Sequence, residues 1–360
     1  MNEKIKSILS TIPVPGAGTD IIAAGLVKNV TEDENKIEIL LAFEASRGEQ
    51  LALEAQVKTQ LAREAYSAEN IKIKFETKGE AGPVEPQVPP PPTPQKIRSI
   101  KKIIAVGSGK GGVGKSTASI NLAASLAAKG YKVGLLDADM YGPSIGQMAG
   151  FDGKTDLPVT ETKITPGEKY GMKIISFSML IDRAQAVVWR GPMLGKALEQ
   201  LIFDIDWGRL DYLIIDLPPG TGDIQLSMAQ LVEVDGFIIV TTPQNVALHD
   251  AERAADMLKK VNIPLVGVIE NMSEFICPSC GHATHIFSKK GGETIANELN
   301  VKMLGSIPIN PVIMESGEKG IPVTAKAEMP WDKKDVESIT SAFDTIIDNL
   351  QKELKKNANT

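Results

Sequence analysis

The chain has 360 residues, of which 42% are hydrophobic and 23% charged, and 39 Lys and Arg against 45 Asp and Glu leave a net charge of −6. This apolar content supports a sizeable core and excludes a disordered or collagen-like chain. No apolar run approaches the roughly 20 residues that cross a bilayer, and the start, MNEKIKSILS, lacks the apolar core of a secretory signal. We therefore expect a cytoplasmic protein, with no nucleic-acid or membrane partner because the acidic balance gives no general attraction to either.

The first part of the sequence predicts a small α+β domain over residues 1–78. Residues 36–43 and 70–76 have the β-branched, apolar character of strands, and residues 49–66 between them are rich in helix-forming residues with apolar positions at helical spacing. A predicted linker, residues 79–98, follows, with seven prolines between Pro83 and Pro94. Such a stretch favours extended polyproline II and acts as a semi-rigid spacer.

After the linker, strand and helix patterns alternate over a predicted second domain, residues 99–356. Helices are predicted at 116–129 and 246–260. Continuous rather than alternating apolar runs are typical of strands covered on both faces, so we expect a mostly parallel sheet between two helical layers. In such folds, ligands bind beyond the carboxyl ends of the strands. The predicted strands are residues 102–107, 132–137, 212–217, 236–241 and 264–270.

A phosphate-binding loop follows the first of these strands. The segment GKGGVGKS fits the pattern G-x-x-x-x-G-K-[ST], with a strand before it and a helix after it. Backbone N–H groups of such a loop surround phosphate oxygens, Lys115 neutralises the β- and γ-phosphates of ATP, and Ser116 ligates Mg²⁺. The predicted nucleotide-binding residues of the loop are Gly109, Lys110, Gly111, Gly112, Val113, Gly114, Lys115, Ser116 and Thr117.

Carboxylates end two other predicted strands. Asp216 follows four apolar residues, as a Walker B aspartate does, and we assign it to the Mg²⁺ shell. Asp139 is assigned to orienting the attacking water, although Asp137 could exchange roles with it. The alternative for Asp223, and to a lesser extent for Asp216, is that the carboxylate only caps the next helix. Glycines and prolines flank these aspartates, so residues 139–144 and 216–223 are predicted to be switches that respond to the γ-phosphate.

The early lysine of KGGVGKST, Lys110, marks a resemblance to the deviant Walker A ATPases. By that resemblance, Lys110 reaches the nucleotide of a second copy, which implies a homodimer. The predicted catalytic residues are then Lys110, Lys115 and Asp139. A cation that meets developing charge in this way acts much like an arginine finger.

Further segments narrow the resemblance to the Mrp/ApbC branch, whose members carry iron–sulfur clusters. These segments are DADMYGPS, WRGPM, DLPPGTGD, ENMS followed by CPSC, and IPINPVIMESGEKGIPV. The resemblance implies that Asn271 contacts adenine, that residues 307–311 border the base, and that the partners are apo iron–sulfur proteins and scaffold proteins.

The two cysteines of the chain, Cys277 and Cys280, stand three residues apart. Two thiolates cannot complete the coordination of a 4Fe–4S cluster, which takes four. A two-fold dimer would supply four and leave the cluster at the surface, bridged between the chains.

The cysteine pair has more than one interpretation. Cys277 and Cys280 could hold one zinc ion together with His282 and His285, although only one residue separates Cys280 from His282. That zinc staple would suit a positioning ATPase bound to membrane or DNA. The CxxC spacing would also suit a dithiol redox switch, and the phosphate loop would also suit a small-molecule kinase. The two histidines are otherwise expected to be solvated loop residues without partners.

The two ends of the chain carry weaker signals. Residues 18–30 and the strand–helix–strand after them are similar to a small iron–sulfur assembly domain. Residues 43–50 lack the cysteine that this domain often carries, so we expect a docking or regulatory role. Near the C-terminus, apolar residues from Val336 to Leu354 fall on one helical face, and we expect that face to pack on the ATPase core rather than on a membrane.

Overall fold

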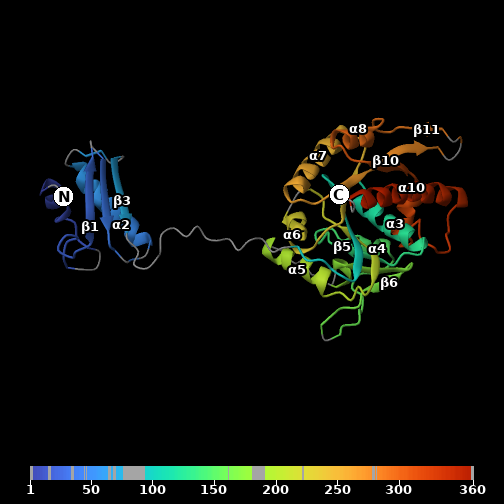
Figure 1. Cartoon of the computed structure of the whole chain (residues 1–360), viewed down its shortest axis with the longest axis horizontal. Helices are drawn as coiled ribbons and strands as arrows, with labels where there is room; N and C mark the ends of the chain where they lie inside the picture. Colours follow the sequence, from blue (N-terminus) through green and yellow to red (C-terminus); the bar gives the residue numbers. More distant parts are fainter. Residues whose placement is uncertain are drawn as a thin grey trace. The chain divides into compact units, whose positions relative to one another are not determined.

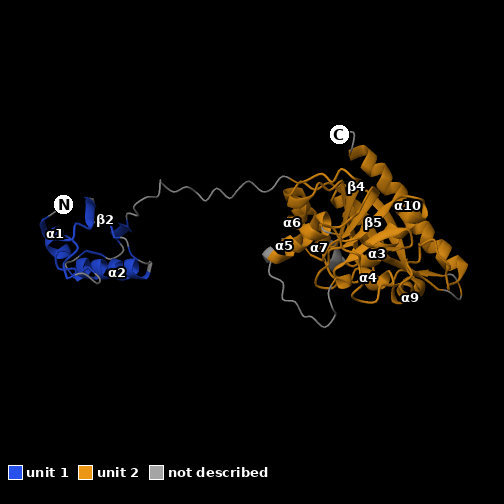
Figure 2. Cartoon of the chain, turned by 90° about the horizontal axis from the view of Figure 1, so that it is seen from below, with its two compact units in different colours: residues 1–88 blue, residues 89–360 orange. Residues whose placement is uncertain are grey.

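The computed structural model divides the chain into two compact units, Met1–Val88 and Pro89–Thr360 (Figure 2). Most of the predicted linker, residues 79–93, lies outside the described residues, so the predicted domain boundaries stay a prediction. The structure describes residues 3–14, 18–33, 36–43, 45, 47–63, 66–67, 70–75, 94–160, 162–180, 191–220, 223–277, 280 and 282–357.

The first unit is a three-stranded sheet with two helices. Strands β1 and β2 are antiparallel, whereas β2 and β3 are parallel. Ile37, Ile39 and Leu41 alternate with more exposed residues along β2 and are buried. The two predicted strands and the helix between them are confirmed, whereas β1 was not predicted because VKNVTED has only two apolar residues. The elements are α1 (Glu3–Leu9), β1 (Val27–Asp33), β2 (Lys36–Leu41), α2 (Arg47–Arg63) and β3 (Ile71–Phe75).

The second unit is built on one nine-stranded sheet with the order β11-β10-β9-β4-β8-β5-β7-β6, and β12 also pairs with β10. The five predicted strands are β4, β5, β8, β9 and β10, and they are neighbours in parallel pairing. The described strands are β4 (Ile100–Gly107), β5 (Val133–Asp137), β6 (Gly167–Lys169), β7 (Met172–Ser176), β8 (Leu210–Asp216), β9 (Gly236–Thr241), β10 (Leu265–Ile276), β11 (Ala283–Thr284) and β12 (Met303–Ile309).

Helices cover both faces of this sheet, as predicted (Figure 1). One core joins the sheet to α3 and α10, and the core on the opposite face joins it to α5, α7 and α8. The helices are α3 (Lys115–Ala128), α4 (Ile145–Met148), α5 (Gly191–Phe203), α6 (Asp223–Leu231), α7 (Asn245–Lys260), α8 (Gly291–Glu298), α9 (Pro311–Lys319) and α10 (Lys333–Asn357).

The apolar face of α10 packs on the sheet, as expected from the sequence. Phe343, Ile346 and Leu350 are fully buried in the same core as α3. Among the described residues, none of the helices combines the length and apolarity that a bilayer-spanning segment needs.

The strand order brings three predicted site segments together. In the β5–β8 pair, Asp137 lies directly opposite Asp216, and in the β4–β8 pair, Val106 lies opposite Asp216. The loop that follows β4 therefore emerges beside both carboxylates. Parallel pairing, not closeness in sequence, assembles the site.

Candidate functional site

The phosphate loop joins β4 to α3, which begins at Lys115. Gly112 and Gly114 have φ angles of +78° and +81°, in the left-handed region that favours glycine. A Cβ at Gly114 would lie 2.0 Å from Asn271 Nδ2, whereas one at Gly112 would meet nothing within 4 Å. The backbone of the loop therefore runs close to the middle of β10.

Lys115 is buried among carboxylates at the start of α3, with an exposed fraction of 6%. Its Nζ lies 2.7 Å from Asp216 Oδ2 and 3.8 Å from Asp139 Oδ2. Ser116 Oγ donates to Asp216 Oδ2 at 2.6 Å. These contacts bring together the predicted phosphate lysine, the predicted Mg²⁺ hydroxyl and the predicted Walker B carboxylate.

Ser119 completes this cluster and was not predicted. Its Oγ donates to the other Asp216 oxygen, Oδ1, at 2.6 Å, so both carboxylate oxygens of Asp216 accept hydrogen bonds. The available signal was its position four residues after Lys115, on the same face of α3.

Asp137 and Asp139 lie in different environments. Asp137 is fully buried and accepts hydrogen bonds from Ile145 N and Ser176 Oγ. Burial, and then the nearby charge of Asp216, raises the pKa of Asp137 to about 7. Asp139 has an exposed fraction of 9%, and burial raises its pKa as well. Asp139 is thus the more accessible of the two carboxylates.

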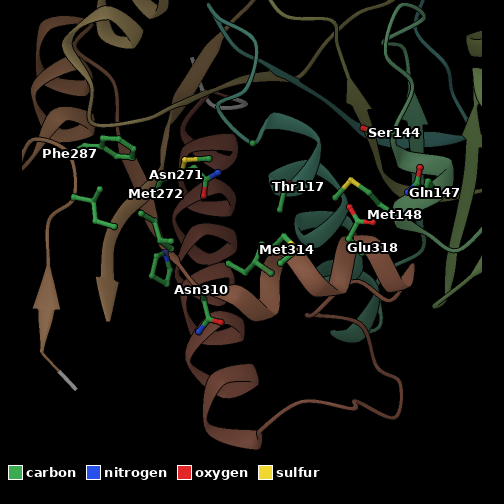
Figure 3. Close-up of a pocket in the computed structure, with 16 residues that line it drawn as sticks. Thr117, Ser144, Gln147, Met148, Asn271, Met272, Phe287, Asn310, Met314 and Glu318 are labelled. Carbon is green, nitrogen blue, oxygen red and sulfur yellow. The ribbon is translucent and has the colours of Figure 1, made fainter. Parts of the chain in front are cut away.

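A cavity of about 640 Å³ opens beside the phosphate loop (Figure 3). Asn271 lines it and donates from Nδ2 to Val113 O at 2.9 Å. Residues 308–310 of the predicted base-bordering segment also line it, but both polar groups of Asn310 are engaged, with Val312 N and with Asp335 Oδ1. The sequence did not predict the methionine lining, because methionines carry no motif. Further lining residues are Gly114, Thr117, Ser144, Gln147, Met148, Met272, Ile286, Phe287, Ile313, Met314, Gly317 and Glu318.

Lys110 is exposed at the surface of the phosphate loop. Its backbone carbonyl accepts a hydrogen bond from Ser108 Oγ at 2.8 Å. Within the described part of the chain, no carboxylate forms an ion pair with its Nζ.

Strands β10 and β11 form a hairpin (Figure 1). Cys277 and Cys280 lie between these two strands in the sequence. Phe275 pairs with Thr284, Ile276 pairs with Ala283, and Cys277 N donates to His282 O at 3.0 Å. Cys277 is half-buried and Cys280 is exposed. Pro278, Ser279 and Gly281 lie outside the described residues, as do Trp189 and Arg190 of WRGPM and Thr221 and Gly222 of the second predicted switch.

The expectation that both histidines lack partners is wrong for His285. Its Nδ1 donates to Ser273 O at 3.2 Å, and its Nε2 lies 3.9 Å from Glu274 Oε2. The hairpin folds His285 back onto the outgoing strand, which local sequence could not reveal. The described residues, which include both cysteines and both histidines, contain no group of three or more His, Cys, Asp or Glu side chains arranged to hold a metal ion.

The residues at both ends of the cysteine hairpin line the cavity. Asn271 and Met272 line the cavity where the hairpin leaves the sheet, and Ile286 and Phe287 line it where the chain returns. Met272 has a φ of +57°, an uncommon backbone conformation for a residue other than glycine. The pairing of β10 with β12 shifts register between Asn271 and Phe275. A strained, irregular segment of β10 thus lies between the part of the strand that pairs with β9 and the cysteines.

Comparison with known proteins shows the family to which the chain belongs. A family model described as the NUBPL iron-transfer P-loop NTPase, of the ParA group, matches residues 99–349. The chain belongs to this family. An iron–sulfur cluster carrier protein of Helicobacter pylori is 36% identical over 353 residues, which cover 98% of this chain and 94% of that protein. The iron–sulfur cluster transfer protein NUBPL of Mus musculus is 45% identical over 64% of this chain and 73% of that protein.

Solved structures show the same P-loop NTPase fold. A nucleotide-binding protein from Archaeoglobus fulgidus in complex with ADP matches with a TM-score of 0.56 and 35% identity, over 62% of this chain and 88% of that one. The cell division ATPase MinD of Pyrococcus furiosus matches with a TM-score of 0.52 and 24% identity, over 70% of this chain and 99% of that one. The predicted fold class is confirmed.

Proposed function

We propose that the chain binds and hydrolyses ATP and carries a 4Fe–4S cluster as cargo between two copies of itself, for delivery to apo iron–sulfur proteins. The observation that carries this proposal is the cysteine hairpin, because its two ends form part of the wall of the cavity beside the phosphate loop. A change of nucleotide in that cavity would act directly on the segment that holds the thiols.

The phosphate-loop geometry supports ATP as the nucleotide. Lys115 lies at the N-terminus of α3, where backbone N–H groups and the helix dipole also favour phosphate. The adjacent cavity is large and its lining is mainly apolar, which suits a base and ribose. Asn271 keeps its Oδ1 without a hydrogen-bond partner among the described residues, and we assign that oxygen to the amino group of adenine.

Mg²⁺ fits the residues beside the loop. Ser116 Oγ and the Asp216 carboxylate present hard oxygen donors 2.6 Å apart, the ligand type that this ion prefers. We propose that these two residues hold it, Asp216 through its water shell, and that it neutralises charge on the phosphates. Lys115 then turns from Asp216 to the phosphate oxygens, and Asp139 orients the attacking water.

The exposed position of Lys110 supports its role in a second copy. An exposed lysine without an ion-pair partner among the described residues is available to a facing protomer. We propose that Lys110 of each copy meets the charge that develops on the γ-phosphate of the other. Hydrolysis would then depend on the arrangement of the dimer.

The cargo proposal requires both copies, since each hairpin offers only Cys277 and Cys280. Their place at the end of a hairpin suits a cluster that is shared at an interface and released when the interface opens. The alignment with the Helicobacter pylori carrier covers 98% of this chain and therefore extends over the first unit. We propose that this unit docks the recipient or scaffold protein.

The cargo test is anaerobic reconstitution with iron and sulfide. We expect about two iron and two sulfide per wild-type chain and a visible charge-transfer band. Cys277→Ala and Cys280→Ala should retain under a tenth of that iron, with a Ser288→Ala control at the wild-type level. Equal iron in wild type and Cys277→Ala would refute the cargo assignment, and stoichiometric zinc in the purified protein would favour a zinc staple instead.

The nucleotide test uses two lysine variants. We expect Lys115→Ala to abolish ATP turnover and to weaken nucleotide binding. Lys110→Ala should bind ATP within threefold of wild type but hydrolyse it at least tenfold more slowly, because its amine acts on the other copy. Unchanged turnover in Lys110→Ala would remove the cross-subunit role.

A further inference from the structure

Gln225 lies in α6, directly after the predicted second switch, and carries no motif of its own. Its side chain is almost fully buried, with an exposed fraction of 1%. Its Nε2 donates to Pro218 O at 2.9 Å and to Gly220 O at 2.8 Å. Both partners are carbonyl oxygens, which only accept, so the orientation of the amide is fixed by its neighbours.

The other half of this amide is unsatisfied. Gln225 Oε1 is a buried side-chain oxygen that has no hydrogen-bond partner among the described residues. Buried polar atoms in native proteins are nearly always paired, because an unpaired one loses its hydration without compensation. An unpaired buried oxygen next to a predicted switch indicates that a second conformation of the loop could give this oxygen a hydrogen-bond donor.

The loop that Gln225 holds is also bonded to the phosphate loop. Gly220 N donates to Ser108 O at 2.8 Å, and Ser108 Oγ donates to Lys110 O at 2.8 Å. Leu217 N donates to Val106 O at 3.0 Å. A continuous set of hydrogen bonds therefore runs from the Gln225 amide through Gly220 and Ser108 to the backbone of Lys110.

We propose that Gln225 is a positioning residue for ATP hydrolysis. Its Nε2 holds residues 217–220 against the phosphate loop through Pro218 O and Gly220 O, and its Oε1 is a buried acceptor that a change of loop conformation on γ-phosphate binding would satisfy. Gly220, with a φ of +92° and open space where a Cβ would lie, gives the loop the freedom to turn. This inference rests on the proposed ATPase function and deepens it, because it names the residue that sets the loop.

The test compares Gln225→Met with Gln230→Met in the full-length protein. Methionine keeps the length of the side chain and removes its hydrogen bonds, and Gln230 offers the same substitution in the same helix. We expect Gln225→Met to lower kcat at least tenfold with KM and ADP affinity within threefold of wild type, and Gln230→Met to change none of them. Gln225→Glu should be equally slow at pH 8 and should recover at least threefold relative to wild type at pH 6, as its protonated form regains a donor.

Hydrogen exchange supplies a readout that does not depend on turnover. The amides of Leu217 and Gly220 should exchange at least tenfold faster in Gln225→Met than in wild type or in Gln230→Met. Unchanged exchange there, or a loss of kcat and ADP affinity by the same factor, would overturn the positioning role. If the wild-type protein shows no ATP turnover while Gln225→Met still exchanges faster, the proposed ATPase function is overturned instead. If Gln225→Met does not fold, Gln225→Glu at the two pH values decides the question.

Discussion

Replacing one of two glycines of the phosphate loop by alanine separates backbone strain from a specific contact. Gly112 and Gly114 have nearly the same positive φ, but only a Cβ at Gly114 would meet a neighbour, Asn271 Nδ2 at 2.0 Å. Gly112→Ala therefore measures strain alone. Gly114→Ala measures strain together with displacement of the Asn271 amide.

The magnitudes follow from the structure. An alanine in the left-handed region costs about 1–2 kcal/mol. Displacing Asn271 breaks its 2.9 Å bond to Val113 O, worth about 1 kcal/mol. We expect Gly112→Ala to lower the free energy of unfolding of the nucleotide-free protein by about 1–2 kcal/mol, and Gly114→Ala by about 2–3 kcal/mol.

The assay is urea unfolding followed by tryptophan fluorescence, because all three tryptophans lie in the second unit. Each alanine is also combined with Asn271→Ala, which removes the obstructing amide. In that background the two substitutions should cost the same within about 0.5 kcal/mol. If Gly114→Ala is no worse than Gly112→Ala, or if the difference between them persists without the Asn271 side chain, the proposed close approach is wrong.

Three further predictions concern stability and the hairpin. Because the pKa of Asp137 is raised to about 7, this group binds more protons in the folded than in the unfolded state between its ordinary pKa and pH 7. Its contribution to the free energy of unfolding therefore falls as pH rises, by at most about 1.4 kcal/mol per pH unit. In urea unfolding at pH 5 and 7, Asp137→Asn should remove that pH dependence. The exposed control Asp256→Asn should leave it unchanged. Phe343→Ala should cost about 3–5 kcal/mol in the same assay, since the ring is fully buried between α10 and the sheet, and a loss under about 1 kcal/mol would contradict this packing. ADP should change the alkylation rate of the two cysteines in metal-free protein at least threefold. Met272→Gly, which relaxes the strained segment between cavity and hairpin, should reduce that change. Equal rates with and without ADP would show that nucleotide binding in the cavity does not affect the hairpin.

Local sequence was enough to predict the elements whose own residues have a clear apolar pattern or motif. The five central strands are runs of β-branched and apolar residues, and they appear within a few residues of the predicted bounds, except that β10 continues to Ile276. The phosphate loop is equally local, because its glycines, Lys115 and Ser116 are consecutive. By contrast, β1 and β12 have mixed or short apolar patterns and take their structure from neighbouring strands.

What the sequence determined by itself is therefore the chemistry of single segments: a loop for phosphate, acidic strand ends and a pair of thiols. Only the tertiary structure decided which of these groups meet. Parallel pairing places Asp137 opposite Asp216, and the position of α3 beside β8 brings Ser119 to Asp216. The hairpin returns to the cavity at Ile286 and Phe287. Contacts between residues far apart in the chain depend on the order of strands in the sheet, and no local pattern records that order.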